Sequence, residues 1–258
     1  MSEFLGTALE AANAAAEIVT RMYRGNLEVS IKADKSPVTD ADVACEKAIR
    51  AVIERRFPAH GFYGEETGKL RADAEYLWIV DPIDGTKAFV REYPMFSTQI
   101  ALMRGGQLIV GVSSAQVYGE TVYAERGEGA WRDGKRLHVS RIDTVESASL
   151  STGNLKSLAR SPRWSDYGKL VARLDRIRGY GDFLHYHLLA AGNIDAVIES
   201  DVNILDIAAL AMIVEEAGGR FTDLNGRPVS LEIDSVLATN GVLHDRLLEA
   251  LPPALEQS

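Results

Sequence analysis

The strongest chemical signal in the sequence is a pair of aspartates directly after an apolar run. The apolar residues 77–80 lead into the segment Asp81-Pro82-Ile83-Asp84-Gly85-Thr86. These residue types also build ordinary turns, so a turn without function is one interpretation. An aspartyl nucleophile pattern has a shorter spacing than the three residues found here. This spacing lets Asp81, the Ile83 carbonyl and Asp84 point at one cation, and such hard oxygen ligands suit Mg²⁺.

Three further acids lie where they could complete a metal site. Glu65 lies in a glycine-flanked turn ahead of the strand that feeds Asp81. Asp42 lies near the start of a predicted helix, and Asp206 enters an apolar, alanine-rich one. Each has an ordinary alternative, which is a solvated charge for Glu65, a helix-dipole contact for Asp42 and an N-cap for Asp206. An unpaired buried carboxylate is costly, however, and a cation would supply the missing partner.

The overall charge bears on the substrate. The chain has 28 Lys and Arg against 37 Asp and Glu, a formal net charge of −9. This balance disfavours nucleic-acid binding, and it suits an anionic substrate only if divalent metals occupy the carboxylates. Two metals can activate a water and stabilise the leaving oxygen of a phosphoryl group. Gly85 and Thr86 would add backbone N–H donors to the phosphate, and the Thr86 hydroxyl could orient the water. The sequence therefore predicts phosphate-ester hydrolysis.

The segments around these residues have the periodicity of regular elements. The N-terminal segment is predicted as an amphipathic core helix. A second helix is predicted over residues 40–57, with Thr39 or Asp40 as its N-cap. Glu46 and Lys47 are expected on a face of this helix away from its apolar residues. Residues 61–68 are predicted as a turn.

The remaining elements set the fold class. Strands are predicted over 77–80, 97–103, 108–113, 121–125, 149–152, 176–180, 196–199, 221–223 and 235–239, and helices over 183–191, 207–217 and 244–250. This order predicts an α+β or layered α/β fold in two parts joined near residue 145. Residues 1–145 are expected to carry most metal ligands. Residues 146–258 are expected to carry Asp206 and the substrate-selecting residues, within one compact unit.

Composition excludes several other classes. The single cysteine, Cys45, excludes an internal disulfide and a cysteine-based zinc site, and it fits a reducing compartment. No stretch near 18 apolar residues and no signal-peptide pattern is present. We therefore expect a cytoplasmic protein that binds neither membranes nor nucleic acid.

Four ordered blocks along the chain carry a family resemblance. They are Lys32 with Ser36-Pro37-Val38-Thr39-Asp40-Ala41-Asp42, then Gly64-Glu65-Glu66, then residues 78–86, and then Asp206-Ile207-Ala208-Ala209 leading to residues 215–219. Minor matches lie at residues 129–134 and 238–241. Together they resemble the inositol monophosphatase family over nearly the whole chain. The resemblance implies a layered αβαβα sandwich of the inositol monophosphatase and fructose-1,6-bisphosphatase type. It also implies an Mg²⁺-dependent, Li⁺-sensitive phosphomonoesterase that forms a homodimer.

The resemblance further implies two metal sites. Glu65, Asp81 and the Ile83 carbonyl resemble the ligands of the first metal. Asp81, Asp84 and Asp206 resemble those of the second.

The same resemblance implies a source for the nucleophile. Asp42, with Glu65, would hold a third, weaker metal and the nucleophilic water, aided by Thr86. Inline attack by this water needs no covalent enzyme intermediate. Lys32 matches a family lysine near the site.

A smaller set of residues bears on the substrate, a small phosphorylated metabolite. The run from Asp84 to Phe89 resembles a branch that includes histidinol-phosphate and 3′-phosphoadenosine 5′-phosphate phosphatases, and Gly181-Asp182 with Tyr186 resembles the histidinol-phosphatase pattern. Asp182 and Glu199 could bind the amino and imidazole groups of histidinol phosphate by charge-assisted hydrogen bonds. The predicted substrate-binding residues are Gly85, Thr86, Asp182, Glu199 and Asp206. A helix N-cap is the alternative for Asp182.

Two features depart from that branch or invite other interpretations. Leu205 replaces an aromatic residue often found before the metal aspartate, and Phe183-Leu184-His185 differs from the residues expected there. His185 and His187 lie two apart on a predicted helix, so they face different ways and are expected to be structural or substrate-rim residues rather than metal ligands.

The leading prediction is a histidinol-phosphatase that produces L-histidinol. The alternative is the same chemistry on inositol 1-phosphate or on 3′-phosphoadenosine 5′-phosphate. A non-catalytic regulatory relative would lack the water-activating residues, but Asp42, Glu65 and Thr86 are all present.

Overall fold

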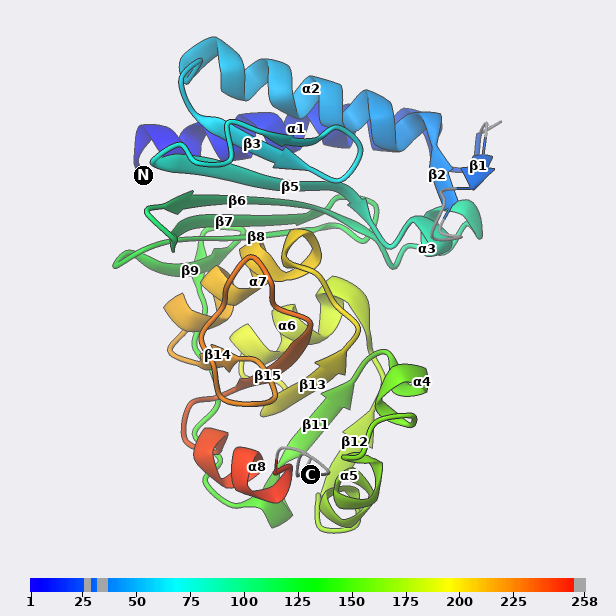
Figure 1. Cartoon of the computed structure of the whole chain (residues 1–258), viewed down its shortest axis with the longest axis vertical. Coiled ribbons are helices and arrows are strands. Elements are labelled where there is room, and N and C mark those ends of the chain that lie inside the picture. The colour runs from blue at the N-terminus through cyan, green and yellow to red at the C-terminus, as the bar shows by residue number, and fades with distance from the viewer. Residues whose placement is uncertain (26–28, 32–36, 253–258) are drawn as a thin grey trace. The chain divides into compact units, whose positions relative to one another are not determined.

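The computed structural model of the chain describes residues 1–25, 29–31 and 37–252, and Lys32 lies outside them. Contacts divide the chain into two units, each drawn in Figure 1. The first comprises Met1–Lys135 with Leu205–Ile213, and the second comprises Arg136–Ile204 with Val214–Ser258. Asp206 therefore groups with the unit that also holds Asp81 and Asp84.

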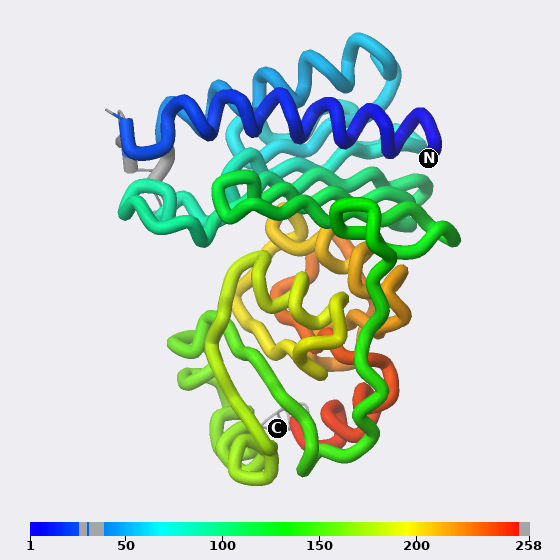
Figure 2. The backbone as a smooth tube through the Cα atoms, turned by 180° about the vertical axis from the view of Figure 1, so that it is seen from behind, coloured from blue at the N-terminus to red at the C-terminus, as the bar shows by residue number. Residues whose placement is uncertain are grey.

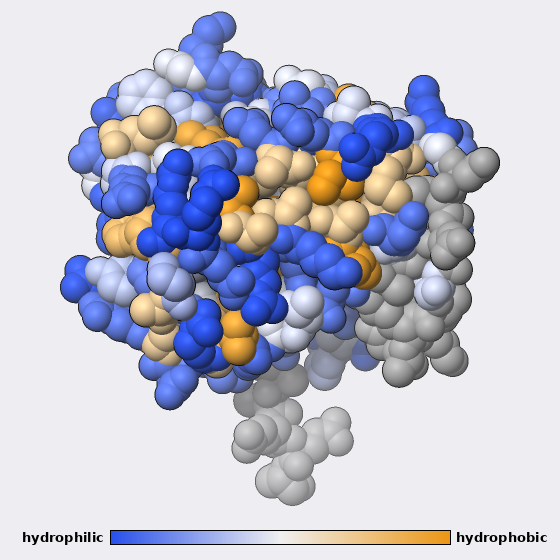
Figure 3. Space-filling model, turned by 90° about the horizontal axis from the view of Figure 1, so that it is seen from above, coloured by the Kyte–Doolittle hydropathy of each residue, from blue (hydrophilic) through white to orange (hydrophobic). Residues whose placement is uncertain are grey.

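Two helices open the first unit. α1 (Glu3–Met22) begins at Ser2, whose hydroxyl accepts a hydrogen bond from the backbone of Leu5. α2 (Asp40–Arg56) begins after Thr39 in a capping box. Most buried positions of α1 are alanines, so its backbone can lie close to its neighbours, and Figure 2 shows α1 and α2 side by side. Hydrophilic side chains predominate on the face seen from above in Figure 3, with smaller groups of hydrophobic ones among them.

These helices pack on an eight-stranded sheet of order β10-β9-β8-β7-β6-β5-β3-β4. β3 and β5 are parallel, whereas β3–β4, β5–β6, β6–β7, β7–β8 and β8–β9 are antiparallel pairs. The strands are β3 (Gly61–Gly64), β4 (Gly68–Leu70), β5 (Tyr76–Asp84), β6 (Ser97–Arg104), β7 (Gln107–Ala115), β8 (Glu120–Glu125), β9 (Gly129–Arg132) and β10 (Lys135–Arg136). A separate antiparallel pair, β1 (Val29–Ile31) and β2 (Pro37–Thr39), precedes α2, and the short α3 (Thr86–Val90) follows β5.

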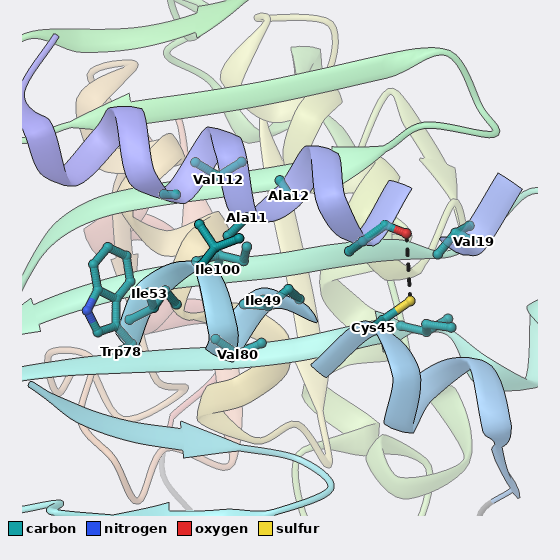
Figure 4. Packing of buried hydrophobic residues seen from close by; sticks show 14 of the residues in the cluster. Ala11, Ala12, Val19, Cys45, Ile49, Ile53, Trp78, Val80, Ile100 and Val112 are labelled. Atoms are coloured by element: carbon teal, nitrogen blue, oxygen red, sulfur yellow. Dashed lines mark hydrogen bonds between the residues drawn. The ribbon is translucent and has the colours of Figure 1, made fainter. Parts of the chain in front are cut away.

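The hydrophobic core of the first unit lies between the two helices and the sheet (Figure 4). Trp78 of β5 and Ile49 of α2 are fully buried there. The Cys45 thiol donates to the Ala15 carbonyl oxygen at 3.7 Å and so joins α2 to α1. Burial raises the pKa of this thiol to about 12, so it stays protonated and unreactive at neutral pH.

The other face of this sheet is covered by part of α7 (Ile204–Glu216). Val110 and Val112 of β7 belong to the core under α1, so Gly111 between them faces the opposite side. A Cβ atom on Gly111 would lie 2.5 Å from the Ala209 carbonyl oxygen. Glycine at this position therefore lets α7 approach the sheet closely.

The second unit has a five-stranded sheet of order β12-β11-β13-β15-β14. Its strands are β11 (Ser149–Thr152), β12 (Arg176–Arg178), β13 (Ala196–Ser200), β14 (Arg220–Thr222) and β15 (Ser235–Thr239). Its helices, besides the ends of α7, are α4 (Leu155–Leu158), α5 (Trp164–Val171), α6 (Asp182–Ala190) and α8 (His244–Ala250), with a 3₁₀ turn at Val145–Ser147. β11 is parallel to β12 and β13, and β15 is antiparallel to both of its neighbours. Leu158, Leu170 and Leu247 from the helices pack with Leu150 and Ile198 of the sheet in one core.

The α+β fold predicted from the sequence is confirmed. The predicted strand 235–239 and helix 244–250 coincide with β15 and α8. The prediction of a turn over 61–68 was wrong at both ends. Residues 61–64 form β3, which pairs with β5, and Gly68 begins β4, which pairs with β3. α7 begins at Ile204, so Asp206 lies in its first turn rather than before it. Among the described residues, no helix combines the length and apolar character needed to span a membrane.

Candidate active site

Asp81 and Asp84 face the same side because the end of β5 contains a bulge. In a regular strand, residues three apart face opposite sides of the sheet. Asp81 pairs with Gln99 and Asp84 with Ser97, so β5 has one more residue than β6 between these pairs. The Thr98 hydroxyl donates to the Pro82 carbonyl oxygen at 2.8 Å and holds the bulge.

Asp206 comes from the first turn of α7 and joins these two aspartates. One carboxylate oxygen from each of Asp81, Asp84 and Asp206 lies within 4.8 Å of the others. Asp81 is buried, whereas Asp84 and Asp206 are partly exposed. The structure therefore brings together three of the acids that the sequence singled out as metal ligands.

Glu65 reaches the same cluster from the turn between β3 and β4. Because β3 runs parallel to β5, Gly64 lies beside Val80, and the Glu65 N–H donates to the Val80 carbonyl oxygen at 3.2 Å. The Glu65 side chain forms a hydrogen bond with Asp81. Two carboxyl groups can share such a bond only if one of them holds a proton.

Asp42 is the fifth acid, and its contacts lead to Thr86. Its Oδ2 accepts from the backbone N–H and the hydroxyl of Thr39 at 2.8 and 2.6 Å, and its Oδ1 accepts from the Thr86 hydroxyl at 3.1 Å. The same hydroxyl lies 3.0 Å from the Ile83 carbonyl oxygen, so Thr86 contacts two predicted site residues. The helix-dipole alternative for Asp42 is thus incomplete, because the carboxylate is fully buried and also holds Thr86.

Gly85 lets the chain turn between Asp84 and Thr86. Its φ of 92° lies in the left-handed region, and a Cβ atom there would lie 2.6 Å from the Met95 carbonyl oxygen. A side chain at this position would therefore be strained and would also clash. Gly85 and Thr86 introduce α3, which is only five residues long.

The electrostatics of the cluster suit a cation. Burial raises the pKa of Asp81 well above its usual value, and the charges of Glu65, Asp84 and Asp206 raise it further. Burial also raises the pKa of Asp42, and its hydrogen bonds to Thr39 and Thr86 oppose this rise. A divalent cation would remove the repulsion among these carboxylates, and oxygen donors are the ligands that Mg²⁺ prefers. The residues present therefore fit a metal site.

A second group of polar side chains, in the second unit, surrounds Glu199. Glu199 lies on β13 and is almost fully buried. The Tyr186 hydroxyl donates to Glu199 Oε2 at 2.8 Å, and His185 Nε2 lies 3.2 Å from the same oxygen. Ser151 Oγ is 3.3 Å from the other ring nitrogen of His185. A Cβ atom on Gly153 would lie 1.9 Å from Glu199 Oε1, so glycine makes room for this carboxylate.

Asp182 lies at the start of α6 in an unusual conformation. Its φ of 44° is left-handed, and the N-cap of α6 is Gly181 rather than Asp182, so the N-cap alternative was wrong. Surrounding protein raises the pKa of Asp182 to about 6, and the charge of Glu199 adds to this effect. The side chain nevertheless reaches solvent, which leaves it accessible to a ligand. A strained, accessible acid with a raised pKa is a common feature of functional sites.

The two histidines of α6 have different surroundings, as predicted. Both are fully buried, and His187 stacks edge-on against Phe183 while His185 faces Glu199. The metal cluster found among the described residues includes neither of them.

Sequence reasoning missed Glu46. It was expected on the polar face of α2, but its side chain is fully buried. Its two carboxylate oxygens accept the N–H groups of Glu66 and Thr67 at 2.7 and 2.9 Å. The available signal was its position one helical turn after Asp42, which places both acids on one face of α2.

Comparisons with known proteins identify the family. The chain matches the inositol monophosphatase family profile over residues 1–256. A histidinol-phosphatase of Mycobacterium tuberculosis is 43% identical over 92% of this chain and 93% of its own. A histidinol-phosphatase of Streptomyces coelicolor is 39% identical over 86% of each chain. The crystal structure of the extragenic suppressor protein SuhB from Bartonella henselae has a TM-score of 0.90 and 31% identity, covering 98% of this chain and 100% of that one.

The chain therefore belongs to the inositol monophosphatase family, whose members are metal-dependent phosphatases. It is a phosphoric monoester hydrolase that acts on small phosphate substrates.

Proposed function

We propose that this enzyme is an Mg²⁺-dependent phosphomonoesterase that hydrolyses L-histidinol phosphate to L-histidinol. The observation that carries the substrate assignment is the pair of acids Asp182 and Glu199, which repel one another in the absence of a cation. The names of the two bacterial relatives described above support the same assignment.

The metal ligands are those that the cluster and the family resemblance suggest together. Glu65, Asp81 and the Ile83 carbonyl would hold one ion, and Asp81, Asp84 and Asp206 would hold a second. When bound, Mg²⁺ supplies positive charge to the phosphoryl oxygens and acidifies water.

Asp42, with Glu65, completes a third and weaker position, where the chain's own residues orient the attacking water. The Thr86 hydroxyl has a single proton, so it cannot donate to both Asp42 and the Ile83 carbonyl at once. If the Ile83 carbonyl were a metal ligand, the Thr86 hydroxyl would donate its proton to Asp42 Oδ1, which lies 3.1 Å away. A lone pair of Thr86 Oγ1 is then available to accept a hydrogen bond from the water. Inline attack follows without a covalent enzyme intermediate.

The remaining residues select the substrate. The backbone N–H groups of Gly85 and Thr86 contact the phosphate, and Asp206 lies beside it. Asp182 and Glu199 bind the ammonium and imidazole groups by charge-assisted hydrogen bonds. The Tyr186 hydroxyl holds Glu199 at 2.8 Å and so fixes the direction in which its free oxygen points.

The test is phosphate release from three substrates at equal concentration with Mg²⁺, each with an EDTA control. They are L-histidinol phosphate, myo-inositol 1-phosphate and adenosine 3′,5′-bisphosphate. We expect the highest kcat/KM for L-histidinol phosphate. A higher value for either other substrate would keep the metal chemistry and reject the substrate assignment. Release that persists in EDTA would reject the metal requirement.

Three further properties follow from the family resemblance and belong to the same proposal. We propose that Li⁺ inhibits the enzyme, that it forms a homodimer and that it works in the cytoplasm. The single buried thiol of Cys45 suits a reducing compartment. Analytical ultracentrifugation tests the dimer, and phosphate release at increasing LiCl, with KCl as the control salt, tests inhibition.

A further inference from the structure

The turn that carries Glu65 is held by a buried acid of α2. Glu46 is fully buried, and its Oε2 and Oε1 accept the N–H groups of Glu66 and Thr67 at 2.7 and 2.9 Å. The preceding N–H, that of Glu65, donates to the Val80 carbonyl oxygen. Three consecutive backbone donors of this turn are therefore engaged, one by β5 and two by a single carboxylate.

Gly64 shows that this contact is closely packed. A Cβ atom at position 64 would lie 2.5 Å from the carboxyl carbon of Glu46. The backbone of Gly64 is part of β3 and pairs with Val80, so it cannot retreat without disturbing that pair. Only glycine lets the Glu46 carboxylate reach the two amides beyond it.

The same face of α2 supports the other loop of the site. Asp42 lies four residues before Glu46, a spacing that places both side chains on one side of a helix. Asp42 accepts a hydrogen bond from the Thr86 hydroxyl, whereas Glu46 accepts hydrogen bonds from backbone N–H groups of the turn that follows β3. Two buried acids of one helix thus hold the two loops that present Thr86 and Glu65.

We infer that Glu46 is a positioning residue of the metal centre: by binding the Glu66 and Thr67 amides it fixes the turn in which Glu65 faces Asp81. Glu46 itself touches neither metal nor substrate in this role. The inference rests on the proposed role of Glu65 as a metal ligand. A charged acceptor suits the task, because hydrogen bonds to an ionised carboxylate are stronger than those to a neutral group.

The decisive variant is Glu46→Gln, which keeps the shape of the side chain but replaces one acceptor oxygen with a donor NH₂ group. We expect the dissociation constant for Mg²⁺, measured by calorimetry on metal-free protein, to rise about tenfold or more, as for other residues that support a ligand. We expect kcat at saturating Mg²⁺ to stay within about threefold of the unaltered enzyme. The matched control is Glu54→Gln, the same change at a partly exposed site of α2 that pairs with Arg50.

Glu65→Gln separates this inference from the proposed function. If Glu65→Gln weakens Mg²⁺ binding and Glu46→Gln does not, the inference is wrong and the proposed metal site stands. If Glu65→Gln leaves Mg²⁺ binding unchanged, the proposed role of Glu65 is wrong and the inference falls with it. A purely structural role for Glu46 would lower the melting temperature without changing Mg²⁺ affinity in the folded protein.

Hydrogen exchange on the unaltered chain decides the question even if Glu46→Gln does not fold. Thr67 is exposed, yet its N–H is bound by Glu46. We expect the Glu66 and Thr67 amides to exchange at least about a hundredfold more slowly than in an unstructured peptide without Mg²⁺, because the turn is already organised. Exchange at the unprotected rate until Mg²⁺ is added would overturn the inference, since the metal would then organise the turn.

Discussion

Single residues of this site combine functions that the sequence suggests separately. Asp42 is both part of a helix cap with Thr39 and the acceptor of the Thr86 hydroxyl. Residue types and spacing singled out several acids as candidate metal ligands, and the structure brings three of them, Asp81, Asp84 and Asp206, close together. The spacing predicted that Asp81 and Asp84 point at one cation, but not that a bulge in β5 brings them to the same side of the sheet. The bulge depends on pairing with β6 and on the Thr98 contact, which are far away in sequence.

Removing the Thr86 hydroxyl tests its role in orienting water. We expect Thr86→Ala to lower kcat by about a hundredfold, within the range for losing a group that assists proton transfer. Mg²⁺ affinity should stay within about threefold, because the proposed ligand set includes Ile83 but not the Thr86 side chain. Thr86→Ser keeps the hydroxyl and should restore most of the activity. Full activity in Thr86→Ala would show that the hydroxyl does not orient the nucleophile.

The raised pKa of Asp182 predicts a pH-dependent preference for a cationic substrate. A carboxyl with a pKa of about 6 is mostly ionised at pH 7.5 and mostly protonated at pH 5, whereas an ordinary aspartate is ionised at both. We expect Asp182→Asn to raise KM for L-histidinol phosphate about tenfold at pH 7.5 but very little at pH 5. Asparagine tolerates the left-handed backbone, so this variant should fold.

The informative quantity is the ratio of the variant's KM to that of the unaltered enzyme at each pH. In this ratio the effect of substrate-phosphate titration on KM cancels, because that titration affects both enzymes equally. Asp175→Asn, at an exposed aspartate of the same unit, is the matched control and should give a ratio near one throughout. A ratio for Asp182→Asn that does not change with pH would contradict the role of its charge.

At the scale of elements, the sequence predicted most helices and strands to within a few residues but missed the two short strands beside the Glu65 turn. The bounds of α2 and α8 were predicted to within one residue. β3 and β4 flank the Glu65 turn and were missed, because their glycines resemble turn residues and β5, the parallel partner of β3, comes later in the chain. Glu46 was misplaced for a related reason, since an acid in an amphipathic helix is normally assigned to solvent. Only the tertiary contact with the Glu66 and Thr67 amides explains its burial.

The link between β5 and α3 should be intolerant of any side chain at position 85. We expect Gly85→Ala to lower the free energy of unfolding by about 3 kcal/mol, because the left-handed φ and the clash with the Met95 carbonyl oxygen both oppose it. Gly106→Ala is the matched control, since Gly106 also has a positive φ, of 84°, but no atom within 4 Å of the added carbon. It should lose only about 1 kcal/mol, the penalty of the backbone conformation alone. Urea denaturation measures both, and equal losses would show that the Met95 contact yields freely.

At the scale of the whole molecule, the protein and its phosphate substrate are both negatively charged, and cations bound to the acidic cluster would offset the repulsion between them. The formal charge of −9 and the carboxylates of Asp81, Asp84 and Asp206 would repel a phosphate unless cations are bound. The chain order predicted the α+β class, which the structure confirms. It could not predict that residues 205–213 group with the first unit, because membership of a unit depends on packing against strands such as β7 rather than on chain order.

Metal binding should therefore stabilise the folded protein as well as activate it. The folded chain gathers carboxylates that are separated in the unfolded chain, so Mg²⁺ should bind the folded state preferentially. At a free concentration one hundred times its dissociation constant, a ligand adds about 2.7 kcal/mol of stability, which corresponds to roughly 5 to 10 °C in melting temperature for a domain of this size. We expect EDTA to reverse the shift and Asp84→Asn to reduce it by more than half. Asp73→Asn, at an exposed aspartate of the same unit, should leave it unchanged. Equal shifts for Asp84→Asn and the unaltered enzyme would place the stabilising ion elsewhere. A residue that binds the ion must weaken Mg²⁺ binding when it is replaced, and weaker binding gives a smaller shift in melting temperature.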